Sequence, residues 1–133
     1  MTDRELLELA AEAAGIEYDK AASFPPDGKT YSFFGLWLVI EGEPNERTRR
    51  RWNPLLDDGD ALRLAVKLRI DIDHGSPLDN SRYVCASCCG IEMVRDAVRA
   101  VEEFEDDVGV QRAYSTRRAI VRAAAELAKQ EKP

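Results

Sequence analysis

The chain has 133 residues, of which 44% are hydrophobic and 33% are charged, and its formal net charge is −6 at pH 7. This length predicts a single domain over residues 1–133, and the composition is ordinary for a soluble globular protein. The acidic balance argues against general nucleic-acid affinity, which usually needs a basic face, and suits a soluble protein or one with a basic partner.

The cellular compartment is indicated by what the chain lacks. Its acidic first residues are not those of a signal peptide, and its longest apolar run, residues 33–40, is too short to span a bilayer. Three cysteines without a secretion signal indicate reduced thiols. We therefore expect a cytoplasmic protein with no membrane contact.

The first helix is predicted to be capped by Thr2 or Asp3 and to end at Gly15. Residues 16–18 suggest a short strand, and a loop with turn-forming residues follows at 21–30.

The clearest strand is predicted at residues 31–41, which are rich in aromatic and branched side chains. Its continuous apolar character indicates a central position covered on both faces, with Trp37 in the core. Residues 46–52 form either a partner strand or a polar loop.

The most informative stretch runs from Trp52 to Asp73. Pro54 makes residues 52–54 an extended entry to a turn, and Trp52 is expected in the core. A helix then follows, with its beginning stabilised by Asp57, Asp58 and Asp60. Its apolar positions are Ala61, Leu62, Ala65, Val66 and Leu68, while Arg63, Lys67 and Arg69 face solvent. Ile70 and Ile72 then alternate with Asp71 and Asp73, as in a strand.

The second half of the chain is less clear. Residues 82–88 are predicted to form a strand, and the spacing of apolar residues favours a helix from Ile91 to Phe104. Ser115 or Thr116 is expected to cap a final helix, and residues 131–133 form a frayed tail. Together these elements predict an α+β fold: an antiparallel sheet of three to five strands with helices packed at the N-terminus, middle and C-terminus.

The string Trp-Asn-Pro-Leu followed by Asp-Asp-Gly-Asp-Ala-Leu-Arg-Leu-Ala-Val-Lys-Leu resembles a block in the phage ABA-sandwich domain family, which comprises small proteins of tailed phages and prophages. Residues 6–15 and 116–127 resemble the opening and closing helices of that family. The resemblance implies an α/β sandwich and a phage origin, but no activity. It also implies a sheet within residues 76–110, where the valine spacing favours a helix, and the sequence leaves this conflict open.

One candidate binding segment consists of Arg47, Arg49, Arg50 and Arg51, which lead into Trp52. Arginines beside an aromatic ring can hold phosphate groups or stack on a base. Three neighbouring glutamates dilute this positive charge, and a solvated loop or edge strand is the preferred interpretation.

His74 together with Cys85, Cys88 and Cys89 could form a tetrahedral zinc site. A second closely spaced Cys or His pair is absent from the sequence, so buried structural cysteines are preferred and no metal or cofactor is predicted.

The acidic residues and His74 have a structural explanation. Asp57, Asp58 and Asp60 could hold a cation or act as general acid and base, as could Asp71 and Asp73. Helix capping and the wet face of a strand account for them, and His74 has no triad partner at a recognised spacing.

No known catalytic constellation stands out, and the family resemblance implies a phage origin. Together they favour a non-enzymatic phage or prophage accessory protein in the host bacterial cytoplasm. It would bind a host or phage protein, for example as an inhibitor of host or anti-phage defence machinery. The alternatives are a small-molecule or nucleotide binder through residues 47–52 and a zinc domain. Homo-oligomerisation is compatible with all three.

Overall fold

The computed structural model describes residues 1–18, 35–38, 50–75, 78, 82–88, 97–105 and 109–130. It has an α+β fold with helices near both ends and in the middle, as the sequence predicts. The elements in chain order are α1 (Asp3–Ala13), β1 (Leu36–Leu38), β2 (Arg50–Trp52), α2 (Asp58–Leu68), β3 (Asp71–Asp73), β4 (Tyr83–Cys88), β5 (Val98–Glu103) and α3 (Gly109–Gln130).

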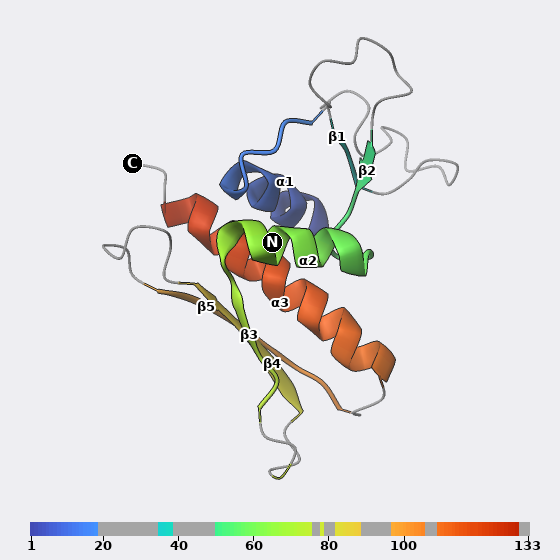
Figure 1. The fold of residues 1–133 in the computed structure, drawn as a ribbon, viewed down its shortest axis with the longest axis vertical. Coiled ribbons are helices and arrows are strands. Elements are labelled where there is room, and N and C mark those ends of the chain that lie inside the picture. Colours follow the sequence, from blue (N-terminus) through green and yellow to red (C-terminus); the bar gives the residue numbers. More distant parts are fainter. Residues whose placement is uncertain are drawn as a thin grey trace.

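Helix α3 is the centre of the fold, because it packs against α1 and α2 and also against β4 and β5 (Figure 1). Its second half is buried on nearly all sides, as expected for a helix between two layers. Small side chains dominate this part and allow close packing. The buried residues are Ala119, Ile120, Val121, Ala123, Ala124, Ala125, Leu127 and Ala128.

The larger sheet has the order β3-β4-β5, and both of its strand pairs are antiparallel. Ile72, Ala86 and Ala100 lie in one row across it and belong to the core or pack against it, which identifies the face turned toward α3. The opposite face carries exposed residues such as Asp71, Asp73 and Arg99.

Strand β5 corrects one prediction. The helix expected from Ile91 to Phe104 is wrong over Val98–Glu103, which forms a strand paired along its whole length with β4. Residues 91–96 lie outside the described residues. The strand predicted at residues 82–88 is confirmed at Tyr83–Cys88.

The smaller sheet pairs β1 with β2, and Tyr18 forms an isolated bridge to Leu38. Strand β1 is the described part of the predicted strand 31–41, whose other residues lie outside the described ranges except Gly35. Trp37 is half-buried rather than in the core, whereas Leu36 is fully buried. Of residues 46–52, predicted as a partner strand or a polar loop, residues 50–52 form a partner strand, and residues 46–49 lie outside the described residues.

The two ends of α1 follow the sequence. Thr2 forms a capping box with Glu5, and Gly15 adopts φ +67°, which allows the amide of Ile16 to bond the carbonyl of Ala11 at 2.9 Å. The beginning of α3 differs from the prediction made from the sequence. That helix already starts at Gly109, so the predicted caps Ser115 and Thr116 lie inside it.

Among the described residues, no helix combines the length and apolar character needed to cross a bilayer.

Candidate functional site

The stretch from Trp52 to Leu68 forms a closed structural unit, which we call the Asn–Pro latch (residues 52–68). Trp52 is 3% exposed, and the side-chain oxygen of the buried Asn53 accepts a hydrogen bond from the amide of Leu55 at 2.9 Å. The carbonyl of Asn53 accepts a second bond, from the amide of Asp57, also at 2.9 Å. Asp57 then caps α2 by accepting the amide of Asp60 at 2.8 Å. The turn and the cap predicted from sequence are therefore confirmed.

Asp60 is the centre of the latch. It is 5% exposed, and its Oδ1 accepts from Arg50 Nη2 at 3.0 Å and from Arg63 Nη2 at 2.8 Å. Its Oδ2 accepts from the amide of Asn53 at 3.0 Å. The carboxylate thereby joins strand β2, the turn and helix α2, which is more than the capping role predicted for it.

Helix α3 is tied to the same latch through Arg117. Its Nε donates to the carbonyl of Leu55 at 2.9 Å, and its Nη1 donates to Asp58 at 2.7 Å. The acidic residues that start α2 are therefore all used in holding the fold together.

The described part of the candidate binding segment, residues 50–52, is turned partly inward. Arg50 bonds Asp60, Trp52 is in the core, and the guanidinium carbon of Arg51 lies 5.4 Å from the ring centre of Trp37. Burial leaves no face of Trp52 on which a base could stack. Arg47 and Arg49 lie outside the described residues.

The residues considered for zinc are not brought together within the described part of the chain. Cys85 and Cys88 are three apart on β4 and so point to opposite faces of the sheet. Cys88 donates to the carbonyl of Leu68 at 3.1 Å, whereas Cys85 accepts from Arg99 Nε at 3.1 Å. His74 lies 3.3 Å from Arg112. Both cysteines are buried, and Cys89 lies outside the described residues.

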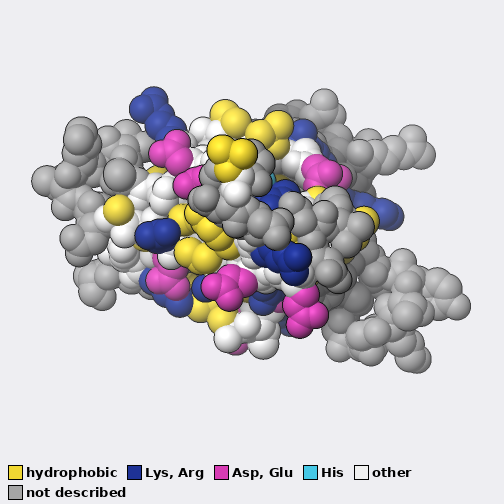
Figure 2. Space-filling view, turned by 90° about the horizontal axis from the view of Figure 1, so that it is seen from below, with side chains coloured by type: hydrophobic (Ala, Val, Ile, Leu, Met, Phe, Trp, Pro, Cys, Tyr) yellow, Lys and Arg dark blue, Asp and Glu magenta, His cyan; other side chains and the backbone are white. Residues whose placement is uncertain are grey.

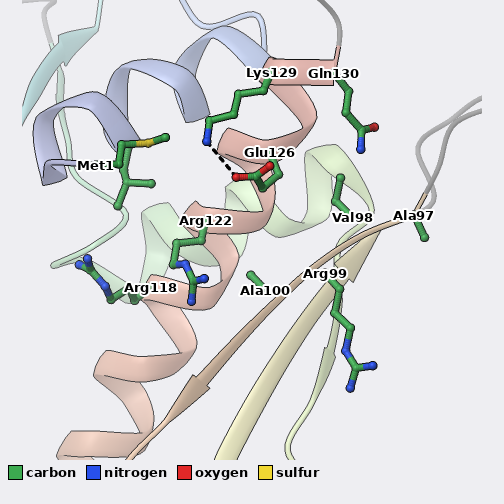
Figure 3. A pocket seen from close by; sticks show the side chains of 11 residues that line it. Met1, Ala97, Val98, Arg99, Ala100, Arg118, Arg122, Glu126, Lys129 and Gln130 are labelled. Carbon is green, nitrogen blue, oxygen red and sulfur yellow. Dashed lines mark hydrogen bonds and ion pairs between the residues drawn. The ribbon is translucent and has the colours of Figure 1, made fainter.

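An open cleft of about 550 Å³ lies between α3, the start of β5 and the beginning of α1 (Figure 3). One side of it is the charged stripe, which we define as Arg118, Arg122, Glu126 and Lys129. These residues follow one another at helical spacing and are the positions of α3 left between its buried ones. Leu6, Val98 and Ala100 are buried residues that line the same cleft.

The arginines of the charged stripe are fixed by acidic residues that do not line the cleft. Arg118 Nη1 donates to Asp3 at 3.0 Å, and its Nε lies 3.4 Å from Glu102. Arg122 Nη1 donates to Glu102 at 3.0 Å and to the carbonyl of Val101 at 2.9 Å. The hydrogen bond with Asp3 raises the pKa of Arg118 above its ordinary value, so its charge is permanent.

Sequence reasoning missed this cleft. The signal was present, because residues 118, 122, 126 and 129 are among the charged positions of an otherwise alanine-rich helix. They were assigned no role from the sequence, and the strand beside them was predicted as a helix.

Helix α2 exposes two residues that were predicted on its apolar face. Leu62 is 61% exposed and Val66 is 69% exposed, and Arg63 and Lys67 are also at the surface. The buried residues of α2 include Leu64, which the prediction omitted. We call Leu62, Arg63, Val66 and Lys67 the α2 outer face. Figure 2, a view from below, shows hydrophobic side chains at the surface between basic and acidic ones.

No protein-family model, curated protein or solved structure matches this chain. The resemblance to the phage ABA-sandwich family thus stays a prediction, and function has to be argued from the described residues themselves.

Proposed function

We propose that this chain is a non-enzymatic binding protein whose α2 outer face docks onto a protein partner. The observation that carries the proposal is the exposure of Leu62 and Val66, which lie one turn apart on the same side of α2. Large aliphatic side chains at such positions gain free energy when a partner covers them, and paired anchors of this kind are typical of helix-in-groove recognition.

The charges beside these anchors define the partner. Arg63 and Lys67 alternate with Leu62 and Val66 along the helix, so the partner should offer an apolar groove bordered by carboxylates. The chain as a whole has a net charge of −6, so this basic face is a local exception. An acidic partner would be repelled by most of the surface and oriented toward α2.

A binding role rather than a catalytic one is supported by the contacts of the residues considered for chemistry. Asp60 is held by three donors inside the latch. Cys88 is hydrogen-bonded to the backbone and Cys85 is hydrogen-bonded to Arg99. His74 is in contact with Arg112. Each of these groups therefore already has a structural partner.

The biological setting that we propose follows from the resemblance of the Trp52–Leu68 block to phage proteins. In that setting the chain is a phage or prophage accessory protein in the host bacterial cytoplasm, and its partner is a host macromolecule. Inhibition of host or anti-phage defence machinery is the role that such a small binding domain would serve.

The test is affinity capture from a bacterial host lysate with three forms of the protein. Wild type and the control Val110→Ser, which alters an 80% exposed valine on α3, should retain the same partner. The double variant Leu62→Ser/Val66→Ser should lose it, and the captured protein should elute as salt is raised because its contacts are partly ionic. Equal capture by all three forms, or capture of nothing, would contradict the proposal.

A second candidate, a small-molecule binder, is favoured by the cleft beside α3 rather than by residues 47–52. The burial of Trp52 and the hydrogen bond from Arg50 to Asp60 argue against ligand binding through residues 47–52.

A further inference from the structure

The surface of the cleft beside α3 is mainly polar, with fixed cations beside a smaller apolar area. Its volume of about 550 Å³ lies in the range of small-molecule sites. Among its apolar residues Met1 and Ala97 are exposed, whereas Leu6, Val98 and Ala100 are buried. The charged stripe provides three cations and one carboxylate. Figure 3 shows Arg99 pointing away from α3, in keeping with its bond to Cys85, so Arg99 is not counted among these cations.

The two arginines are held in place before any ligand arrives. Asp3 and Glu102 engage Nη1 of Arg118 and Nη1 of Arg122, and Glu102 also lies near Nε of Arg118. Within the described part of the chain, no such contact engages the Nη2 group of either arginine. A guanidinium has five N–H donors, so each Nη2 can still donate to an oxyanion. Because these side chains are already held in place, they lose less conformational entropy when a ligand binds.

The far end of the stripe is different in character. Lys129 is paired with Glu126 at 3.0 Å, so this end is close to neutral and offers both a donor and an acceptor. Asp3 and Glu102 likewise balance the charges of Arg118 and Arg122, so the two ends differ in their spare donors rather than in net charge. An anionic group would be held at the Arg118–Arg122 end by the Nη2 groups, with the rest of the ligand extending along β5.

We propose that this cleft binds a small organic anion, with its carboxylate or phosphate held by Arg118 and Arg122 and the rest of the ligand extending toward Ala97. The site is independent of the α2 outer face. It requires no covalent step, and its affinity should fall as ionic strength rises because the contacts at the head group are ionic.

The experiment is a titration of the full-length, ¹⁵N-labelled protein followed by amide chemical shifts. The probes are hexanoate and adenosine 5′-monophosphate, and their uncharged counterparts are hexanamide and adenosine. At least one anionic probe should bind saturably, with Kd values in the millimolar range or tighter, and should shift amides in residues 97–100 and 118–130. Its uncharged counterpart should not. Hexanoate binding alone indicates a carboxylate ligand, and binding of the monophosphate alone indicates a phosphate ligand.

Variants locate the site. Arg122→Gln should weaken binding by about tenfold or more, because it removes a charged donor. Arg4→Gln, which alters an exposed arginine paired with Glu8 on α1, should leave the affinity unchanged. Ala97→Trp keeps every charge but fills the rim of the cleft at an exposed position, and it should abolish binding even if Arg122→Gln proves poorly folded.

The proposal is overturned if neither anionic probe shifts these amides at about 20 mM, well above a millimolar Kd. It is also overturned if hexanamide or adenosine binds as tightly as its anionic counterpart, or if Ala97→Trp binds like wild type.

Discussion

Asp60 and Glu102 each receive two arginines, but they lie at different depths in the protein. Asp60 is 5% exposed and also accepts a hydrogen bond from a backbone amide, so its contacts hold β2 against α2. The side chain of Glu102 is 19% exposed and sits behind two arginines that line an open cleft. A carboxylate that pairs with two arginines therefore stabilises the fold at Asp60. At Glu102 the same arrangement holds two arginines at the surface, where they keep unused donors.

This difference shows that burial, rather than the number of ion pairs, decides what such a cluster does. A buried carboxylate must have all of its hydrogen-bonding capacity filled, and removing it leaves other buried groups without a partner. A partly exposed carboxylate such as Glu102 can be replaced by water at little cost, so its main effect is to orient its neighbours.

The largest expected effect is that of Asp60→Ala. This change removes three hydrogen bonds and leaves the amide of the buried Asn53 without its acceptor, so we expect a loss of about 2–4 kcal/mol in the free energy of unfolding. Urea denaturation followed by circular dichroism measures it.

The control for that measurement is Asp58→Ala, two residues earlier in the same helix. Asp58 is 81% exposed and pairs with Arg117, so its loss should cost less than about 1 kcal/mol. Equal losses for the two variants would mean that the burial of the carboxylate does not determine how much stability its removal costs.

Glu102→Gln is expected to have a smaller effect, about 1 kcal/mol, because Arg118 and Arg122 regain water when the charge is removed. Repeating both urea titrations in 1 M NaCl sharpens the comparison. The loss caused by Glu102→Gln should shrink by about half or more, while that of Asp60→Ala should persist, because salt screens exposed pairs far better than buried ones. A salt-insensitive Glu102→Gln would place that cluster in the core as well.

The smallest effect concerns Arg69, the residue that directly follows the latch. Arg69 terminates α2 with φ 55°, a left-handed conformation that is costly for a residue with a side chain. Arg69→Gly should therefore raise the free energy of unfolding by about 0.5 kcal/mol, after allowance for the greater freedom of glycine in the unfolded chain. Thermal unfolding by calorimetry checks it, and a lower melting temperature would show that the Arg69 side chain makes contacts that stabilise the fold.

The latch could be read from the sequence because its determinants are local. Pro54 and Asp57 act on residues within a few positions of themselves, and the turn and the cap form as predicted. The role of Asp60 could not be read in the same way, since Arg50 lies ten residues away on strand β2.

Strand β5 could not be read locally because its pairing with β4 decides its structure. Val101 reinforced the helical spacing, yet it lies on the outer face of the sheet, where an apolar residue was not needed. Ser115 and Thr116 misled in a similar way: the hydroxyl of Thr116 donates to the carbonyl of Arg112 inside α3 instead of capping its start. The cleft was missed because it depends on both of these elements being in place.

The central position of α3 has a consequence for synthesis on the ribosome. This helix follows all the other described elements in the chain, and α1, α2, β4 and β5 all pack against it. The earlier elements therefore leave the ribosome with their apolar faces uncovered until α3 follows and covers them. Until then, the nascent protein should be a substrate for chaperones and proteases, and the speed at which α3 is translated should influence how much of it survives.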